Sequence, residues 1–173
     1  FGVTRPELLI VCLAPGLHGA NARGRPFTGD HAGIMLFKTL HKFGFSSHSE
    51  SLPGDNLALF KCRITNAVKC LPPQNKPVAS EVNTCRSLLK SELDGLPNGA
   101  VIIALGKISH DSIVRAFGLS IAKLSFGHGT EYDLAGGRKI LSSYHCSRYN
   151  TQTGRLNQKM FEEIFKRAKA LTS

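Results

Sequence analysis

Hydrophobic positions alternate along this chain between short unbroken runs and segments with helical spacing. Unbroken or nearly unbroken runs are typical of buried strands, which we expect at residues 8–13, 62–68, 100–105 and 140–144. Apolar residues recurring every three or four positions predict helices at 34–43, 80–96, 109–117 and 157–171. Strands that alternate with helices predict an α/β fold: a three-layer α/β/α sandwich around a mostly parallel sheet of about four strands.

Length and composition add that this is one domain of ordinary globular character. The chain has 173 residues, of which 42% are hydrophobic, and it contains no internal repeat or linker. We therefore expect residues 1–173 to form a single domain, and we expect a monomer.

The net charge of +10, from 22 basic and 12 acidic residues, favours a polyanionic partner such as nucleic acid. A soluble protein that is merely basic would show the same charge. The basic residues are spread along the chain, which suits a folded binding face better than a disordered arm.

No apolar run approaches the roughly 20 residues of a membrane span, and no signal peptide is visible. The five cysteines are odd in number, which argues against a disulfide scaffold and for a reducing cytoplasm. Cys12 and Cys62 fall inside predicted strands and are interpreted as small core residues. We therefore expect a cytoplasmic protein with no membrane partner.

The segment 13–30 follows the first predicted strand and contains four glycines and two prolines. Ligands bind at the carboxyl ends of strands in open α/β sheets, so a long, sharply turned loop in this place indicates a site. It carries several polar and aromatic side chains: His18, Asn21, Arg23, Arg25, Phe27 and Asp30.

Three sequence motifs resemble those of one known family. They are LAPGLHGANARGRPFTGDHAG at 13–33, NAVKCLPPQNKP at 66–77 and SYHCSRYNTQTGRL at 143–156. Together they resemble the uracil-DNA glycosylase superfamily, most of all its iron–sulfur branch, family 5. The resemblance implies a DNA-binding groove across the strand ends. It also implies a monofunctional enzyme that flips uracil out of single- or double-stranded DNA and hydrolyses its N-glycosidic bond. Hypoxanthine and xanthine are further candidate bases.

The resemblance implies three catalytic residues. Asp30 would assist the attack of water or stabilise the sugar cation, Asn75 would orient the water, and His145 would donate a hydrogen bond to the base oxygen. Each also has a structural interpretation: a helix-cap aspartate, a turn asparagine and a histidine paired to backbone. No lysine nucleophile is evident in the motifs, so we expect no lyase activity.

Four residues are candidates for binding the flipped base. Phe27 would stack on it, as the matching phenylalanine does in relatives, and Asn66 would read its edge with both an amide donor and an acceptor. His18 and Asn21 would line the pocket. Alternatively, Phe27 is a core aromatic, Asn66 a buried amide, and His18 and Asn21 tie the loop together.

We expect Ser147, Arg148, Tyr149 and Asn150 to form a loop that enters the DNA. Arg148 is the candidate phosphate contact. Tyr149 is the candidate wedge that fills the gap left by the flipped nucleotide. Cys146 stands where the commonest form of the motif has proline.

The resemblance also implies a cofactor. Cys70 and Cys85 match the last two of the four cysteines that hold the family's [4Fe–4S] cluster. The other two belong to a CxxC segment ahead of the first strand, which this sequence does not contain. Either that segment belongs to the full-length protein, which then holds a structural cluster as we expect, or the cluster is absent. We expect no catalytic metal.

The alternative function is a module of the same fold that binds damaged DNA without cutting it. A nucleotide-binding or metal-dependent hydrolase on a similar sheet is disfavoured. The chain lacks the GxxxxGK[ST] and GxGxxG spacings, and it has no cluster of carboxylates or histidines at metal-ligand spacing.

Overall fold

The computed structural model describes residues 1–16 and 24–172, and its strands form one five-stranded sheet. The strands are β1 (Leu8–Cys12), β2 (Cys62–Asn66), β3 (Val101–Leu105), β4 (Glu131–Asp133) and β5 (Lys139–Ser143). Their order is β2-β1-β3-β5-β4, and all neighbours are parallel except β4, which is antiparallel to β5. The α/β prediction is confirmed, with a sheet of five strands instead of about four.

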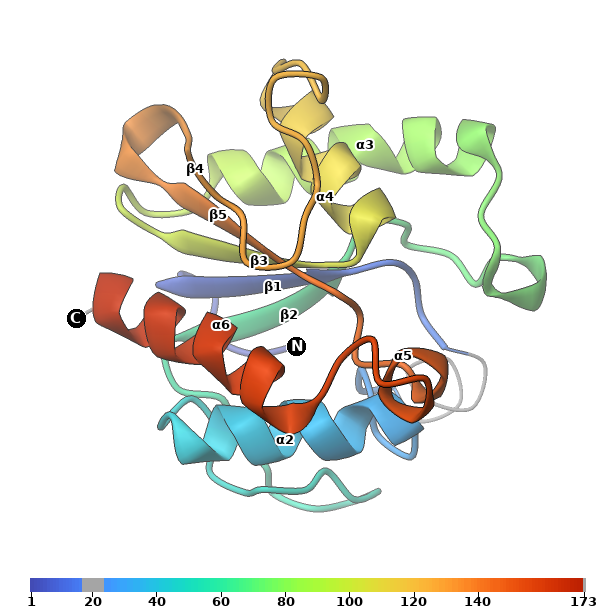
Figure 1. Ribbon diagram of the computed structural model, residues 1–173, viewed down its shortest axis with the longest axis vertical. Helices are drawn as coiled ribbons and strands as arrows, with labels where there is room; N and C mark the ends of the chain where they lie inside the picture. The colour runs from blue at the N-terminus through green and yellow to red at the C-terminus, as the bar shows by residue number, and fades with distance from the viewer. Residues whose placement is uncertain (17–23, 173) are drawn as a thin grey trace.

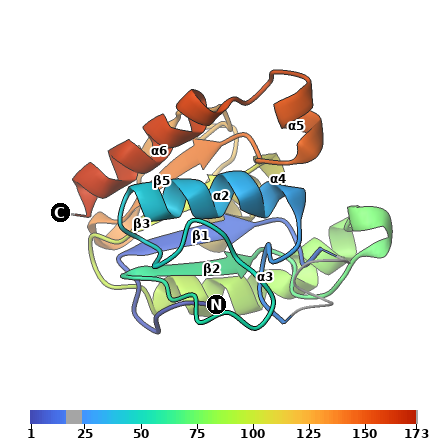
Figure 2. The same ribbon diagram turned by 90° about the horizontal axis from the view of Figure 1, so that it is seen from below.

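Helices cover both faces of this sheet. They are α2 (His31–Lys42), α3 (Ala79–Asp94), α4 (Lys107–Ala116), α5 (Arg148–Gln152) and α6 (Gln158–Leu171), with two short 3₁₀ helices, η1 (Pro73–Asn75) and η2 (Ala135–Gly137). Figures 1 and 2 show α3 and α4 on one face and α2 and α6 on the other. No helix in the described part of the chain is long and apolar enough to cross a membrane.

The sheet divides the core into two hydrophobic clusters, because successive side chains of a strand point to opposite faces. Leu8 and Ile10 of β1 pack on the α2 and α6 side, whereas Leu9 and Val11 pack on the α3 and α4 side. Every residue of β1 and β3 is buried, which explains their unbroken apolar sequences. Cys12 and Cys62 lie in the first of these clusters, as the sequence predicts.

The expectation of a loop over residues 147–150 was wrong in part, because Arg148–Gln152 form the short helix α5. The Ser147 side chain caps it by accepting a hydrogen bond from the Asn150 backbone N–H at 3.4 Å. A helix of five residues is too short to show a repeating spacing of apolar residues, so the sequence pattern did not predict it.

Candidate functional site

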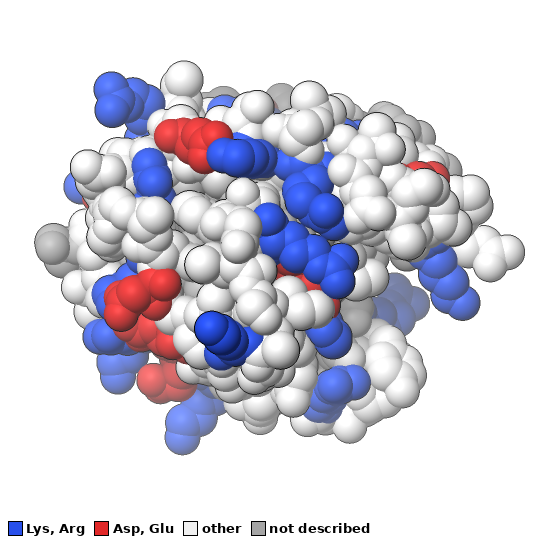
Figure 3. All heavy atoms as spheres, turned by 90° about the horizontal axis from the view of Figure 1, so that it is seen from above, with Lys and Arg blue, Asp and Glu red and all other residues white. Residues whose placement is uncertain are grey.

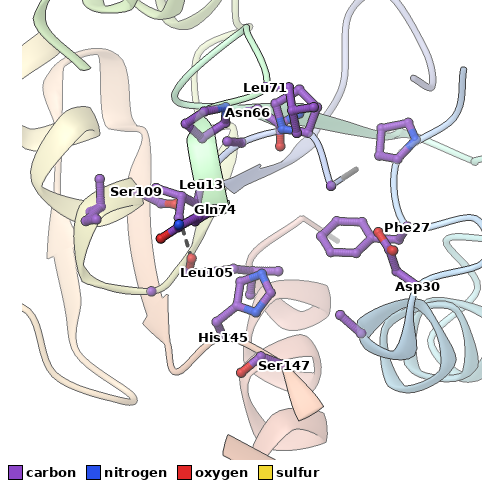
Figure 4. Close-up of a pocket in the computed structure, with 18 of the residues that line it drawn as sticks. Leu13, Phe27, Asp30, Asn66, Leu71, Gln74, Leu105, Ser109, His145 and Ser147 are labelled. Atoms are coloured by element: carbon purple, nitrogen blue, oxygen red, sulfur yellow. Dashed lines mark hydrogen bonds between the residues drawn. The ribbon is translucent and has the colours of Figure 1, made fainter. Parts of the chain in front are cut away.

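The carboxyl ends of the four parallel strands open into a cavity of about 1040 Å³. Asn66 ends β2 and Leu105 ends β3, while Leu13 and His145 lie just beyond β1 and β5. Figure 4 shows these side chains converging on one space, with Phe27 and Asp30 on the side opposite Asn66 and His145. The cavity therefore lies where open α/β sheets bind their ligands.

The turn before α2 places Phe27 at the cavity in a strained conformation. Phe27 has a φ of 63°, in the left-handed region that non-glycine residues seldom adopt. Gly33 in α2 lies directly against it, since a Cβ on Gly33 would come within 2.1 Å of the Phe27 carbonyl oxygen. Close packing of this glycine holds the turn, and strain of this kind is commonly retained at functional sites.

Asp30 stands at the start of α2, half-buried, and lines the same cavity. Asp30 is the N-cap residue of α2, and its side chain makes no capping hydrogen bond to the helix. Gly16, in the loop after β1, packs close by: a Cβ there would lie 2.8 Å from Asp30 Oδ2. The helix dipole favours negative charge at this position.

His145 faces Phe27 across the cavity, with 6.1 Å between the ring centroids and 37° between the ring planes. Burial lowers the pKa of His145 to about 4, because the charged form would lose its hydration. The ring is therefore neutral at neutral pH.

The four residues predicted to contact DNA lie at the start of α5, and two of them line the cavity. Ser147 and Arg148 line the cavity, and Tyr149 is 70% exposed. Asn150 points elsewhere: its side-chain amide donates to the His145 carbonyl at 2.9 Å. The Asn150 side chain is therefore hydrogen-bonded to the protein's own backbone at His145.

The asparagine predictions have different outcomes. The Asn66 side chain lines the cavity from β2. Asn75 ends η1, whose Pro73 and Gln74 line the cavity, but the Asn75 side chain lies outside what the structure describes. His18 and Asn21 also lie outside the described residues.

Sequence reasoning missed two groups that line the cavity. Gln74 reaches it from η1 with a φ of 53°, and residues 106–109 reach it from Gly106 and the first turn of α4. Ile108, in the first turn of α4, lines the cavity and is 41% exposed. The carboxyl end of a buried strand was the signal that identified Asn66 and His145, and it applies equally to residues 106–109.

The two candidate cluster cysteines lie on neighbouring segments. The buried Cys85 Sγ accepts a hydrogen bond from the backbone N–H of Lys69 at 3.3 Å, and Lys69 precedes the exposed Cys70. The Phe1 amino group donates to the Ile64 carbonyl at 3.0 Å, in the strand that leads to Cys70. Within residues 1–16 and 24–172, no group of three or more potential metal ligands is found.

Basic side chains are prominent on the surface over α3 and α4. Figure 3 looks onto this side and shows more blue than red, with several basic groups gathered near the centre. Lys107 and Arg148 are the basic residues among those that line the cavity, and Lys107 is paired with Asp111 at 2.6 Å.

Comparison with known proteins gives a consistent result. The family model of the uracil DNA glycosylase superfamily matches residues 1–169. The type-5 uracil-DNA glycosylase of Thermus thermophilus is 48% identical over 171 residues, covering 99% of this chain and 78% of that protein. The type-5 protein of Mycobacterium bovis is 40% identical over 174 residues, covering 99% and 65%. A type-4 uracil-DNA glycosylase of Thermotoga maritima is 30% identical over 145 residues, covering 83% and 67%.

Proposed function

The chain belongs to the uracil-DNA glycosylase superfamily, and from that premise we propose that it is a DNA repair hydrolase that releases uracil from DNA. The observation that carries the proposal is the meeting of an Asp30 carboxylate, an aromatic Phe27 and a neutral His145 in one cavity at the strand ends. The resemblance of the motifs assigned these residues to uracil chemistry, and the cavity unites them.

The reaction requires the target nucleotide to leave the duplex and enter the cavity. Cleavage of the N-glycosidic bond leaves positive charge on the sugar and negative charge on the uracil oxygen. Asp30 stabilises the first and His145 donates a hydrogen bond to the second, while Phe27 stacks on the base. Water adds its hydroxyl to the sugar carbon, and its proton balances the departing base. Asn66 reads the base edge, and Asn75 orients the water.

The direct test is a base-release assay on a duplex that contains one uracil. Release is expected in EDTA without added divalent metal, because side chains and water perform the reaction. Activity that disappears with EDTA and returns with Mg²⁺ or Zn²⁺ would identify a metal-dependent hydrolase. Tight binding of the same duplex without release would identify a binding module.

Tyr149→Ala is expected to slow release from U·A duplexes more than from U·G duplexes or single strands. Extruding a paired, stacked base costs a few kcal/mol, and less when the base is mismatched or unpaired. Tyr149, 70% exposed beside the cavity, offsets that cost only where there is a stack to fill. Single-turnover rates on the three substrates measure the difference.

Arg148→Ala is the matched control for Tyr149→Ala, because the two residues are adjacent in α5. A phosphate contact carries no sequence information, so its loss weakens binding about equally for all three substrates and reduces the salt dependence. Equal rate losses on all three substrates for Tyr149→Ala would show that Tyr149 is not a wedge.

We further propose that Cys70 and Cys85 supply two of the four thiolates of a structural [4Fe–4S] cluster. Their fit is partial: adjacent segments carry the two thiols, and a backbone N–H already points at Cys85 Sγ. No described residue supplies a third ligand beside them. A cluster there would fix the segment between Asn66 and α3, which includes η1 and four cavity-lining residues, 71–74.

Cys70→Ser and Cys85→Ser are each expected to remove iron, acid-labile sulfide and visible absorbance from the purified full-length protein. Cys62→Ala is the control, since Cys62 is a buried core thiol in β2 and should leave the iron content unchanged. Wild-type protein without iron, or iron retained in both serine variants, would refute the assignment.

A further inference from the structure

The backbone around His145 is held by side chains as well as by the sheet. The Tyr144 N–H donates to His128 Nδ1 at 3.2 Å, and Ser143 Oγ donates to the Tyr144 carbonyl at 2.8 Å. The Asn150 amide donates to the His145 carbonyl at 2.9 Å. Buried backbone groups need such partners, and these three side chains satisfy backbone groups of Tyr144 and His145.

Of these three hydrogen bonds, the one between His128 and Tyr144 joins the residues farthest apart in the sequence. His128 lies half-buried in the irregular segment between α4 and β4, sixteen residues before Tyr144. The rings of His128 and Tyr144 are stacked, with centroids 5.1 Å apart and planes at 21°. The Arg155 guanidinium lies 4.6 Å from the Tyr144 ring centroid. His128 therefore contacts Tyr144 through both its ring face and its ring nitrogen.

The contacts require one protonation state of His128. Nδ1 accepts a hydrogen bond from Tyr144, so it carries no proton, and the proton of the neutral ring is on Nε2. The His128 ring also hydrogen-bonds the backbone of Met160 in α6. Burial lowers the pKa of His128, which favours the neutral ring. A proton on Nδ1 would place two N–H groups opposite each other and break the contact with Tyr144.

We propose that His128 is a positioning residue that holds the Tyr144 backbone and thereby sets the place of the His145 ring in the cavity. This inference rests on the proposed function, in which His145 contacts the base. His128 itself does not line the cavity among the described residues, so it acts through the chain beyond β5. Small displacements of a reacting group are costly: about 1 Å can lower a rate by about a hundredfold.

Two substitutions separate positioning from general stability. His128→Asn keeps an acceptor where Nδ1 was, because asparagine Oδ1 occupies that place. His128→Gln keeps a polar group where Nε2 was and loses the acceptor toward Tyr144. We expect single-turnover uracil release to stay within about threefold of wild type for the asparagine variant. The glutamine variant should be slower by about tenfold or more, with unchanged affinity for a duplex carrying an abasic site.

Histidine ring NMR spectra provide a readout independent of turnover. The His145 Cε1–H signal should move in His128→Gln and stay in place in His128→Asn, with exposed His48→Asn as the control. Equal rates and equal spectra for the two His128 variants would overturn the positioning role, as would a rate loss that follows melting temperature alone. Wild-type protein that releases no uracil would refute the proposed function, while the NMR comparison would still test the positioning.

Discussion

Asp30→Asn is expected to slow single-turnover release of uracil by about 30- to 1000-fold, corresponding to about 2–4 kcal/mol of transition-state stabilisation. Asparagine keeps the shape of the side chain and removes its charge. The sugar becomes positively charged as the glycosidic bond breaks, so the carboxylate in the cavity stabilises the transition state more than the bound substrate. Binding of the duplex should change little.

Stability and a matched variant distinguish this effect from damage to the fold. A negative charge at a helix N-terminus contributes about 0.3–1 kcal/mol to stability, which is a shift of about 2–4 °C at most in a chain of this size. Asp94→Asn removes an exposed carboxylate at the C-terminal end of α3. This residue precedes the amino end of β3, whereas the cavity lies at the carboxyl ends of the strands. That control should keep the wild-type rate. An Asp30→Asn enzyme with the full rate would exclude Asp30 from the mechanism.

The buried strands were predictable because each consists of unbroken apolar residues, as in β1 and β3. Strand β4 was missed for the opposite reason. Its three residues, Glu131–Asp133, are half-buried or exposed and include two carboxylates. They form a strand because they pair with β5 at the sheet edge, which is a tertiary contact that a local pattern does not contain.

The site was predictable to the extent that it follows strand ends and a recognised motif. Asp30, Phe27, Asn66 and His145 line one cavity, and the roles that the motifs imply for them stay predictions. Gln74 was missed because its position depends on the conformation of η1, with a positive φ that glutamine seldom adopts. The contact of Asn150 with the His145 carbonyl was missed because it depends on the turn that α5 makes.

The electrostatic state of His145 was also beyond the sequence. The motif indicated that a neutral imidazole would suffice, but neutrality arises from burial at the base of the cavity. Several distant segments together produce that burial: the ends of the strands, the turn at Phe27 and the start of α5. The chemical role follows from residue type, and the protonation state follows from the assembled fold.

His145→Ala is expected to lower single-turnover uracil release by about 30- to 1000-fold, because it removes the donor to the oxygen on which negative charge develops. His145→Gln, which can place an amide N–H in the same direction, should recover part of the loss. His48→Ala is the control, since it removes an exposed histidine that contacts only its own loop. Full activity in His145→Ala would show that the histidine is not a donor in the reaction.

The pH dependence tests the protonation state of His145. With a pKa of about 4, the ring stays neutral from pH 6 to 8, so the rate ratio of wild type to His145→Gln should be constant over that range. A cationic His145 would instead give a rate that rises as pH falls through about 6.5 and a ratio that rises with it. The unfolded chain takes up a proton at this histidine before the folded protein does. The contribution of His145 to the free energy of unfolding is therefore complete above about pH 6.5 and is lost as the pH falls toward 4. Titration of the His145 ring signal by NMR measures that pKa directly, and a midpoint near 6.5 would contradict the neutral-donor mechanism.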